Sequence, residues 1–249
     1  MQSKSNKSPL ARRLKQELQG DVLFDDFSRG RYSTDASIYQ LMPIGVVIPH
    51  NDQDVEAAVK IAAEEGIPVL PRGGGTSQNG QAIGEALLID STRHLNQVVE
   101  FDQVQRTVCV QPGMVLDQLN RYLKPHGLIY PVDVSTANRA TLGGMTGNNS
   151  CGARSIRYGN MVHNVRSVEA LLADGTRAHF KSVNGDQQDN PAYQNLVQQM
   201  LELGKREAGE IRARFPDLLR RVGGYNIDEL INDQPNMGRL LVGSEGRVV

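Results

Sequence analysis

The chain has little of what a nucleic-acid-binding protein needs. It contains no tryptophan and only 5% aromatic residues, so few rings are available for stacking the bases of a single strand. Its 27 lysines and arginines are balanced by 28 aspartates and glutamates, which leaves a net charge of −1. A surface that neutralises phosphates needs an excess of cations. We therefore predict no nucleic-acid partner.

Cysteine and long apolar runs are also scarce. Cys109 and Cys151 do not form a CxxC pair, so neither a disulfide framework nor a cysteine metal site is predicted, and a reducing, cytoplasmic location is expected. No apolar run reaches the roughly 18 residues of a membrane-spanning helix, and the polar N-terminus is unlike a signal peptide. The five histidines lack metal-binding or catalytic spacing, so we predict no metal site and no catalytic residue.

Helical and strand-like patterns alternate along the chain, which indicates an α/β or α+β class. Apolar residues recur with helical spacing in 9–19, 52–65, 114–123 and 192–214. Short β-prone runs occur at 45–49, 67–71, 86–90, 97–102, 107–111 and 239–242, and 165–180 contains a hairpin turn at 173–176. The strand, helix and strand between 45 and 71 lead directly into a glycine-rich loop, and that order is typical of a βαβ unit.

Glycine is in excess, with 25 residues, and its first concentration lies in 71–84. Gly73, Gly74 and Gly75 follow a predicted strand, and the hydroxyl side chains of Thr76 and Ser77 come next. Glycines let successive backbone amides converge on an anion. The loop lacks the lysine of a Walker loop and the third glycine of a Rossmann fingerprint. We favour a pyrophosphate site as the interpretation, and a flexible glycine-rich turn is the alternative.

The second concentration of glycine lies in 131–159, which is poor in charge and rich in small polar residues. Such a segment can lie flat against a ligand and offer it side-chain amides and hydroxyl groups. The side chains suited to this are those of Ser135, Thr141, Asn148, Asn149 and Ser150. A string of tight turns is the alternative interpretation.

Together the two segments resemble a known family. The motifs are Pro71–Ser77, Gly80–Ala82, Thr141–Gly144, Asn148–Ser155, Tyr158-Gly159 and Leu172–Gly175. They are similar to the FAD-linked oxidases with a PCMH-type (vanillyl-alcohol-oxidase-like) FAD-binding domain. Within that family, Arg220–Leu230 is most similar to large bacterial FAD/iron–sulfur D-2-hydroxyacid dehydrogenases of the D-lactate, D-2-hydroxyglutarate and glycolate type.

The resemblance implies an α+β fold in which FAD lies between two α/β subdomains. Residues 1–35 would be an N-terminal helix and lead-in, and 36–249 the FAD-binding domain, with subdomains of about 36–95 and 96–249. Family members often link FAD covalently through a histidine just after the glycines. Thr76 stands at that position, so a non-covalent FAD is expected.

The resemblance also implies which residues bind the cofactor. The first group, around the pyrophosphate, is Pro71, Arg72, Gly73, Gly74, Gly75, Thr76, Ser77, Gly80 and Gln81. The second group, along the adenosine, ribityl and isoalloxazine portions, is Pro131, Asp133, Ser135, Thr141, Gly143, Gly144, Asn148, Asn149, Ser150, Gly152, Tyr158 and Gly159.

The implied activity is oxidation of a D-2-hydroxy acid to a 2-keto acid by hydride transfer to flavin N5. In the family the substrate-binding cap and any iron–sulfur cluster follow the flavin domain, whereas this chain ends at Val249. We therefore expect a fragment with an incomplete second subdomain, which meets the hydroxy acid only with the missing cap and lacks turnover alone. The alternatives are a flavin module that acts only with a partner chain, a flavin reductase of the UDP-sugar enolpyruvyl type, and a truncated remnant without function.

Overall fold

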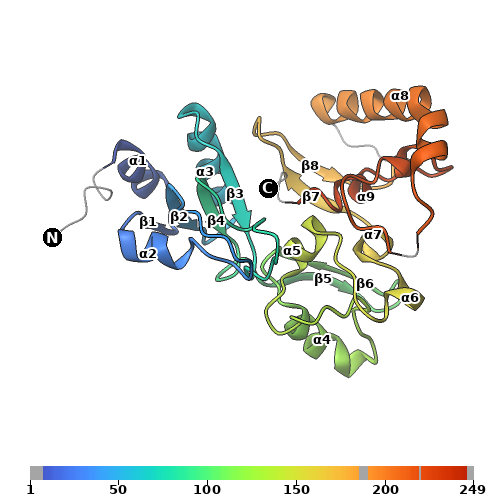
Figure 1. Cartoon of the computed structure of the whole chain (residues 1–249), viewed down its shortest axis with the longest axis horizontal. Coiled ribbons are helices and arrows are strands. Elements are labelled where there is room, and N and C mark those ends of the chain that lie inside the picture. Colours follow the sequence, from blue (N-terminus) through green and yellow to red (C-terminus); the bar gives the residue numbers. More distant parts are fainter. Residues whose placement is uncertain (1–7, 185–189, 219, 246–249) are drawn as a thin grey trace.

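The computed structural model describes residues 8–184, 190–218 and 220–245, which form two regions side by side (Figure 1). The first region is built by the N-terminal elements. They are α1 (Pro9–Glu17), β1 (Asp21–Leu23), α2 (Asp26–Arg31), β2 (Gly45–Ile48), α3 (Asp52–Glu64), β3 (Val69–Arg72) and β4 (Leu87–Asp90). Residues 9–31, set apart as a lead-in by the sequence analysis, thus contribute a strand and two helices to this region.

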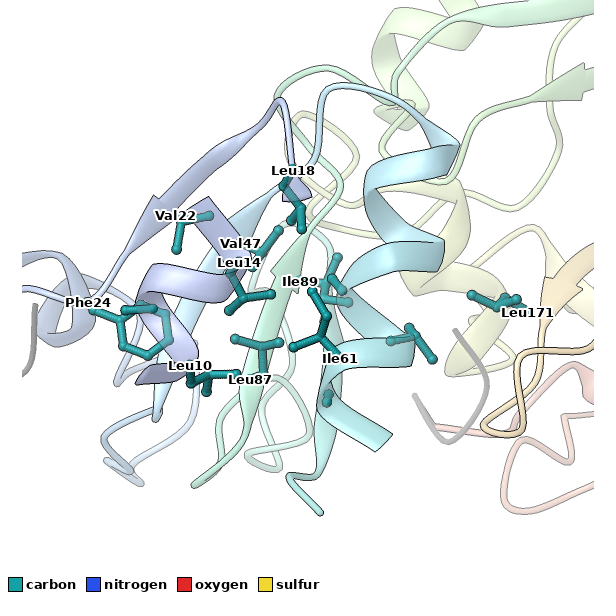
Figure 2. Close-up of a cluster of buried hydrophobic side chains, with 14 residues drawn as sticks. Leu10, Leu14, Leu18, Val22, Phe24, Val47, Ile61, Leu87, Ile89 and Leu171 are labelled. Atoms are coloured by element: carbon teal, nitrogen blue, oxygen red, sulfur yellow. The ribbon is translucent and has the colours of Figure 1, made fainter. Parts of the chain in front are cut away.

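The strands of the first region form one sheet in the order β1-β2-β4-β3. β4 is parallel to both β2 and β3, while β1 runs antiparallel to β2. Every residue of β2 and β4 is buried, which explains their continuous apolar runs, since central parallel strands are covered on both faces. Leu14 of α1, Ile61 of α3 and Leu87 of β4 pack together in the core between helices and sheet (Figure 2).

The second region holds the remaining elements around two antiparallel ribbons, β5–β6 and β7–β8. The elements are β5 (Val98–Asp102), β6 (Thr107–Val110), α4 (Leu116–Leu123), η2 (Lys124–His126), α5 (Leu142–Gly147), α6 (Ser155–Tyr158), α7 (Met161–Asn164), β7 (Val168–Leu171), β8 (Arg177–Phe180), α8 (Pro191–Arg214), η3 (Ile227–Ile231) and α9 (Met237–Leu241). Leu119 of α4, Met145 of α5 and Met161 of α7 share one core cluster. The β7–β8 ribbon packs against α8 and α9 through a second cluster that includes Phe180 and Tyr193.

The predicted α+β class and the succession of helices and strands are confirmed, with two corrections. The predicted strand at 239–242 is wrong, because Met237–Leu241 is the helix α9. Asn236 caps this helix by accepting a hydrogen bond from the amide of Arg239 at 3.1 Å. The glycine-rich segment 131–159, for which no helix was predicted, also contains the short helices α5 and α6. The sequence also predicts loops at 181–191 and 243–246, and residues 185–189 of the first and Gly246 of the second lie outside the described residues.

Candidate functional site

The first glycine loop starts at the carboxyl edge of the parallel strands. Arg72 ends β3, Asp90 ends β4, and the two residues are paired in the sheet register. In open sheets of parallel strands, ligands bind in the crevice outside this edge. The topology therefore places the loop where a cofactor site is expected.

The backbone amides of this loop are unpaired. Within the described chain, the amides from Gly73 to Ser77 donate no hydrogen bond. Gly75 and Gly80 have φ angles of +63° and +75°, in the left-handed region that glycine adopts without strain. Because backbone donors are normally paired, a run of free amides on a turning loop is suited to an anion that accepts from them.

The loop lies directly against the second glycine segment. A Cβ atom on Gly73 would be 2.1 Å from Thr141 Oγ1, and one on Gly74 would be 2.2 Å from the carbonyl oxygen of Arg139. Thr141 is the N-cap of α5 and accepts a hydrogen bond from the amide of Gly144 at 3.3 Å. The structure thus brings the two predicted segments together at the junction of the two regions, beside α5 (Figure 1).

Close backbone contacts also explain glycines inside the second segment. A Cβ atom on Gly143 would lie 2.7 Å from Pro112 Cβ, and one on Gly152 would lie 2.2 Å from the carbonyl oxygen of Asp133. The Asp133 carboxylate accepts a hydrogen bond from the amide of Arg154 at 2.9 Å. These glycines and Asp133 shape the segment itself.

Asn149 joins the second segment to the C-terminal part of the chain. Its side chain is buried, and its Oδ1 accepts from the amide of Val162 at 3.0 Å while its Nδ2 donates to the carbonyl of Arg221 at 3.3 Å. The amide of Gly243 donates to the carbonyl of Thr146 in α5 at 2.9 Å. The motifs at Asn149, Arg221 and Gly243 therefore gather around the helices of the second segment.

The predicted cofactor residues form two sets, according to whether their side chains make hydrogen bonds within the protein. Within the described chain, the side chains of Arg72, Ser77, Gln81, Asp133, Thr141 and Asn149 make hydrogen bonds to the protein itself. In the same described part, the side chains of Thr76, Ser135, Asn148 and Ser150 make none, so they are available to a ligand. Tyr158 is exposed, and the guanidinium of Arg157 lies 5.4 Å from its ring centre. Contact of each of these residues with FAD remains a prediction.

Tyr32 and Asp90 lie at the start of the loop, and no role was predicted for them from the sequence. The Tyr32 hydroxyl donates to Asp90 Oδ2 at 2.7 Å. Burial, together with this hydrogen bond, raises the pKa of Tyr32 above its usual range. A sequence signal existed for Asp90, which ends the predicted strand 86–90.

A separate cleft of about 210 Å³ lies between α7 and the segment that precedes η3. Its lining includes His163, Arg221, Asp228 and Glu229, and none of the predicted cofactor residues. Arg221 and Asp228 form an ion pair at 2.5 Å, and burial raises the pKa of Glu229. This cleft is distinct from the junction at the glycine loop.

Comparisons with known proteins identify the domain that contains this junction. A family described as FAD binding domain matches residues 43–181. D-2-hydroxyglutarate dehydrogenase of Pantoea ananatis is 36% identical over 242 residues, which cover 93% of this chain and 24% of that protein. Glycolate oxidase subunit GlcD of Bacillus subtilis is 36% identical over 163 residues, 64% of this chain and 35% of that protein. The chain thus spans about a quarter of the length of the dehydrogenase relatives that it matches.

The fold is also similar to that of solved enzyme structures. Alkyldihydroxyacetonephosphate synthase superposes with a TM-score of 0.62 at 24% identity, over 72% of this chain and 36% of that one. In the described part of the chain, no helix combines the length and the apolar character that crossing a bilayer requires. The family match covers more than half of the chain and contains both glycine segments. The chain therefore belongs to the family described as FAD binding domain.

Proposed function

We propose that this chain holds FAD non-covalently at the junction, with its pyrophosphate on the loop Gly73–Ser77 and its remaining portions along 131–159. The observation that carries the proposal is the run of unpaired amides in that loop, packed against the second glycine segment at the carboxyl edge of the sheet. The free side chains of Thr76, Asn148 and Ser150 supply further hydrogen-bonding groups. When bound, FAD supplies the hydride-accepting chemistry.

The proposed reaction is oxidation of a D-2-hydroxy acid to a 2-keto acid. Relatives named for 2-hydroxyglutarate and for glycolate support this substrate class, since both compounds carry a hydroxyl group next to a carboxylate. The share of this chain in the reaction is to bind and orient the cofactor. The chain spans about a quarter of the length of its dehydrogenase relatives. We propose that substrate binding requires a segment equivalent to the part of those relatives that this chain does not match. The two free cysteines fit a reducing compartment, and we propose the cytoplasm as the location.

The test of cofactor binding is an absorbance spectrum and a melting curve of the purified chain, each with and without added FAD. A ligand that binds only the folded state at 100 times its dissociation constant stabilises that state by about 2.7 kcal/mol. We expect FAD to raise the melting temperature and to be released on denaturation. FMN, which lacks the adenosine half and the pyrophosphate, is the matched control and should give a smaller shift. A folded sample that neither retains FAD nor melts higher with it contradicts the proposal.

Turnover is tested separately. We expect the chain of 249 residues alone to reduce no dye when D-2-hydroxyglutarate or D-lactate is added, even with FAD bound. Dye reduction that depends on either hydroxy acid would show that this chain contains a complete active site.

A further inference from the structure

The side chain of Arg72, at the start of the glycine loop, is hydrogen-bonded to the backbone at the far end of the loop and to a more distant segment. Its Nη1 donates to the carbonyl of Ala82 at 2.9 Å and to that of Tyr32 at 3.3 Å, and its Nη2 donates to the carbonyl of Thr34 at 2.9 Å. Ala82 lies beyond the far end of the loop, whereas Tyr32 and Thr34 belong to the segment that leads into the sheet. One guanidinium therefore ties the two ends of the loop to a third stretch of chain.

The loop itself passes close to this guanidinium. A Cβ atom on Gly75 would lie 2.6 Å from Arg72 Nη2. The carbonyl of Gly75 accepts from the amide of Ala36 at 3.1 Å, and the amide of Ala82 donates to Asp35 Oδ2 at 3.4 Å. The carbonyl of Gly75 and the two ends of the loop are thus engaged in hydrogen bonds, while the amides from Gly73 to Ser77 stay free.

The Tyr32 ring packs against the guanidinium of Arg72, and Asp90 fixes the position of Tyr32. The charged carbon of Arg72 lies 5.4 Å from the centre of the Tyr32 ring, and the Tyr32 hydroxyl donates to Asp90. Asp90 Oδ1 accepts from the amide of Thr92 at 2.8 Å, so its carboxylate is fixed as well. Burial lowers the pKa of Arg72, but an arginine remains charged, and charged donors make the stronger hydrogen bonds.

We propose that Arg72 is a positioning residue that holds the glycine loop in its anion-binding shape before FAD arrives, and is not itself a phosphate ligand. Its donors already point to the carbonyls of Tyr32, Thr34 and Ala82. A loop fixed beforehand loses less conformational entropy when a ligand binds, so the affinity for FAD depends on this guanidinium indirectly. The effect on FAD rests on the function proposed above, whereas the effect on the loop does not.

The test compares Arg72→Lys and Arg72→Met with the wild-type chain, and Arg93→Met is the matched control. Arg93 lies in the same region, is exposed, and pairs with Asp21 at 3.1 Å. Hydrogen exchange is measured on the protein without FAD, and affinity is then measured by FAD titration. Lysine keeps the charge but lacks the planar fork that reaches several carbonyls at once. Both Arg72 variants should therefore exchange the hydrogen-bonded amides at the loop, those of Ala36, Gln81 and Ala82, about tenfold faster and bind FAD about tenfold more weakly.

The outcomes separate the alternatives. If Arg72 binds phosphate directly, Arg72→Lys keeps most of the affinity and the loop exchanges as in the wild type, and this result overturns the proposal. Unchanged exchange of α8 shows that a variant is folded. If Arg72→Met fails to fold, Tyr32→Phe is the second variant, because it removes only the hydroxyl that bonds to Asp90. We expect it to speed hydrogen exchange of the loop about threefold. Exchange at the wild-type rate in that variant also overturns the proposal. A wild-type chain that binds no FAD refutes the proposed function, while the exchange measurement still decides the role of Arg72.

Discussion

At the scale of single residues, Gly74 sets how closely the two glycine segments approach. Any side chain there would meet the backbone carbonyl of Arg139, which cannot move aside as a flexible side chain could. We expect Gly74→Ala to cost about 1–3 kcal/mol of unfolding free energy, as other overpacked contacts do, and to weaken FAD binding. Chemical denaturation and FAD titration measure the two effects.

The control for this change is Gly209→Ala. Gly209 lies in α8, and a Cβ atom added there meets nothing within 4 Å. Alanine inside a helix is favoured over glycine, so this variant should gain about 0.5–1 kcal/mol and leave FAD binding unchanged. Equal effects of the two substitutions would show that the approach of the two segments does not matter.

Because of Tyr130, the stability of the fold should decrease at alkaline pH. Burial raises its pKa above the usual range, and its hydroxyl donates to Met161 Sδ at 3.3 Å. Since the folded state keeps this proton longer than the unfolded state, stability is complete below the unfolded pKa of about 10 and falls as the pH rises above it. Tyr130→Phe should flatten that fall. Denaturant unfolding at a series of pH values checks this, and Tyr122→Phe, at an exposed tyrosine, should leave the pH dependence as it is.

At the scale of elements, Asp54 connects α3 to the segment that precedes β1 and to the turn that follows β2. Its side chain is 3% exposed, and its two oxygens accept from the amides of Gln19 and His50, each at 2.8 Å. Asp54→Ala leaves two amides without a partner, so we expect a loss of about 2–4 kcal/mol. Asp52→Ala, at an exposed residue in the same helical turn, should cost about 0–1 kcal/mol. Thermal melting of both variants tests the difference, and equal losses would contradict it.

Elements were predictable where local signals and burial agree. The buried strands β2 and β4 have unbroken apolar runs, and α3 has helical spacing behind the cap Asn51. α5 was missed because Gly143 and Gly144 are poor helix formers, and the cap Thr141 and contacts with Pro112 fix the helix instead. α9 was misread because its short apolar run fits a strand or a helix equally well.

The candidate site was predictable only in part for a similar reason. Glycines are informative by themselves, because few other residues permit close backbone approach, so both glycine segments stand out in the sequence. The contacts of Arg72 cannot be recognised in the sequence. Its acceptor on Tyr32 is 40 residues away and is a backbone carbonyl, which any residue provides. Contacts between a side chain and a distant backbone leave no pattern in one sequence.

At the scale of the whole molecule, the two regions share part of a core. Leu171 of β7 is 8% exposed and belongs to the cluster formed by α1, α3 and the first sheet, at the side of α3 that faces the second region (Figure 2). Arg177 of β8 pairs with Asp52 and Glu56 of α3 at 3.2 Å and 3.0 Å. The β7–β8 ribbon thus contacts α3 and the core of the first region, and the two regions should unfold together.

Removing the Leu171 side chain should weaken that coupling. Leu171→Ala deletes buried methyl groups, at a cost of about 2–4 kcal/mol, and most of the loss falls on contacts between the regions. We expect the single calorimetric transition of the wild type to broaden or split in this variant. Arg177→Ala removes exposed ion pairs worth about 0–1 kcal/mol and should keep one sharp transition. FAD bound between the regions should restore a single transition in Leu171→Ala, because a ligand that contacts both regions stabilises only the state in which both are folded. A split that FAD leaves unchanged would place the cofactor on one region alone.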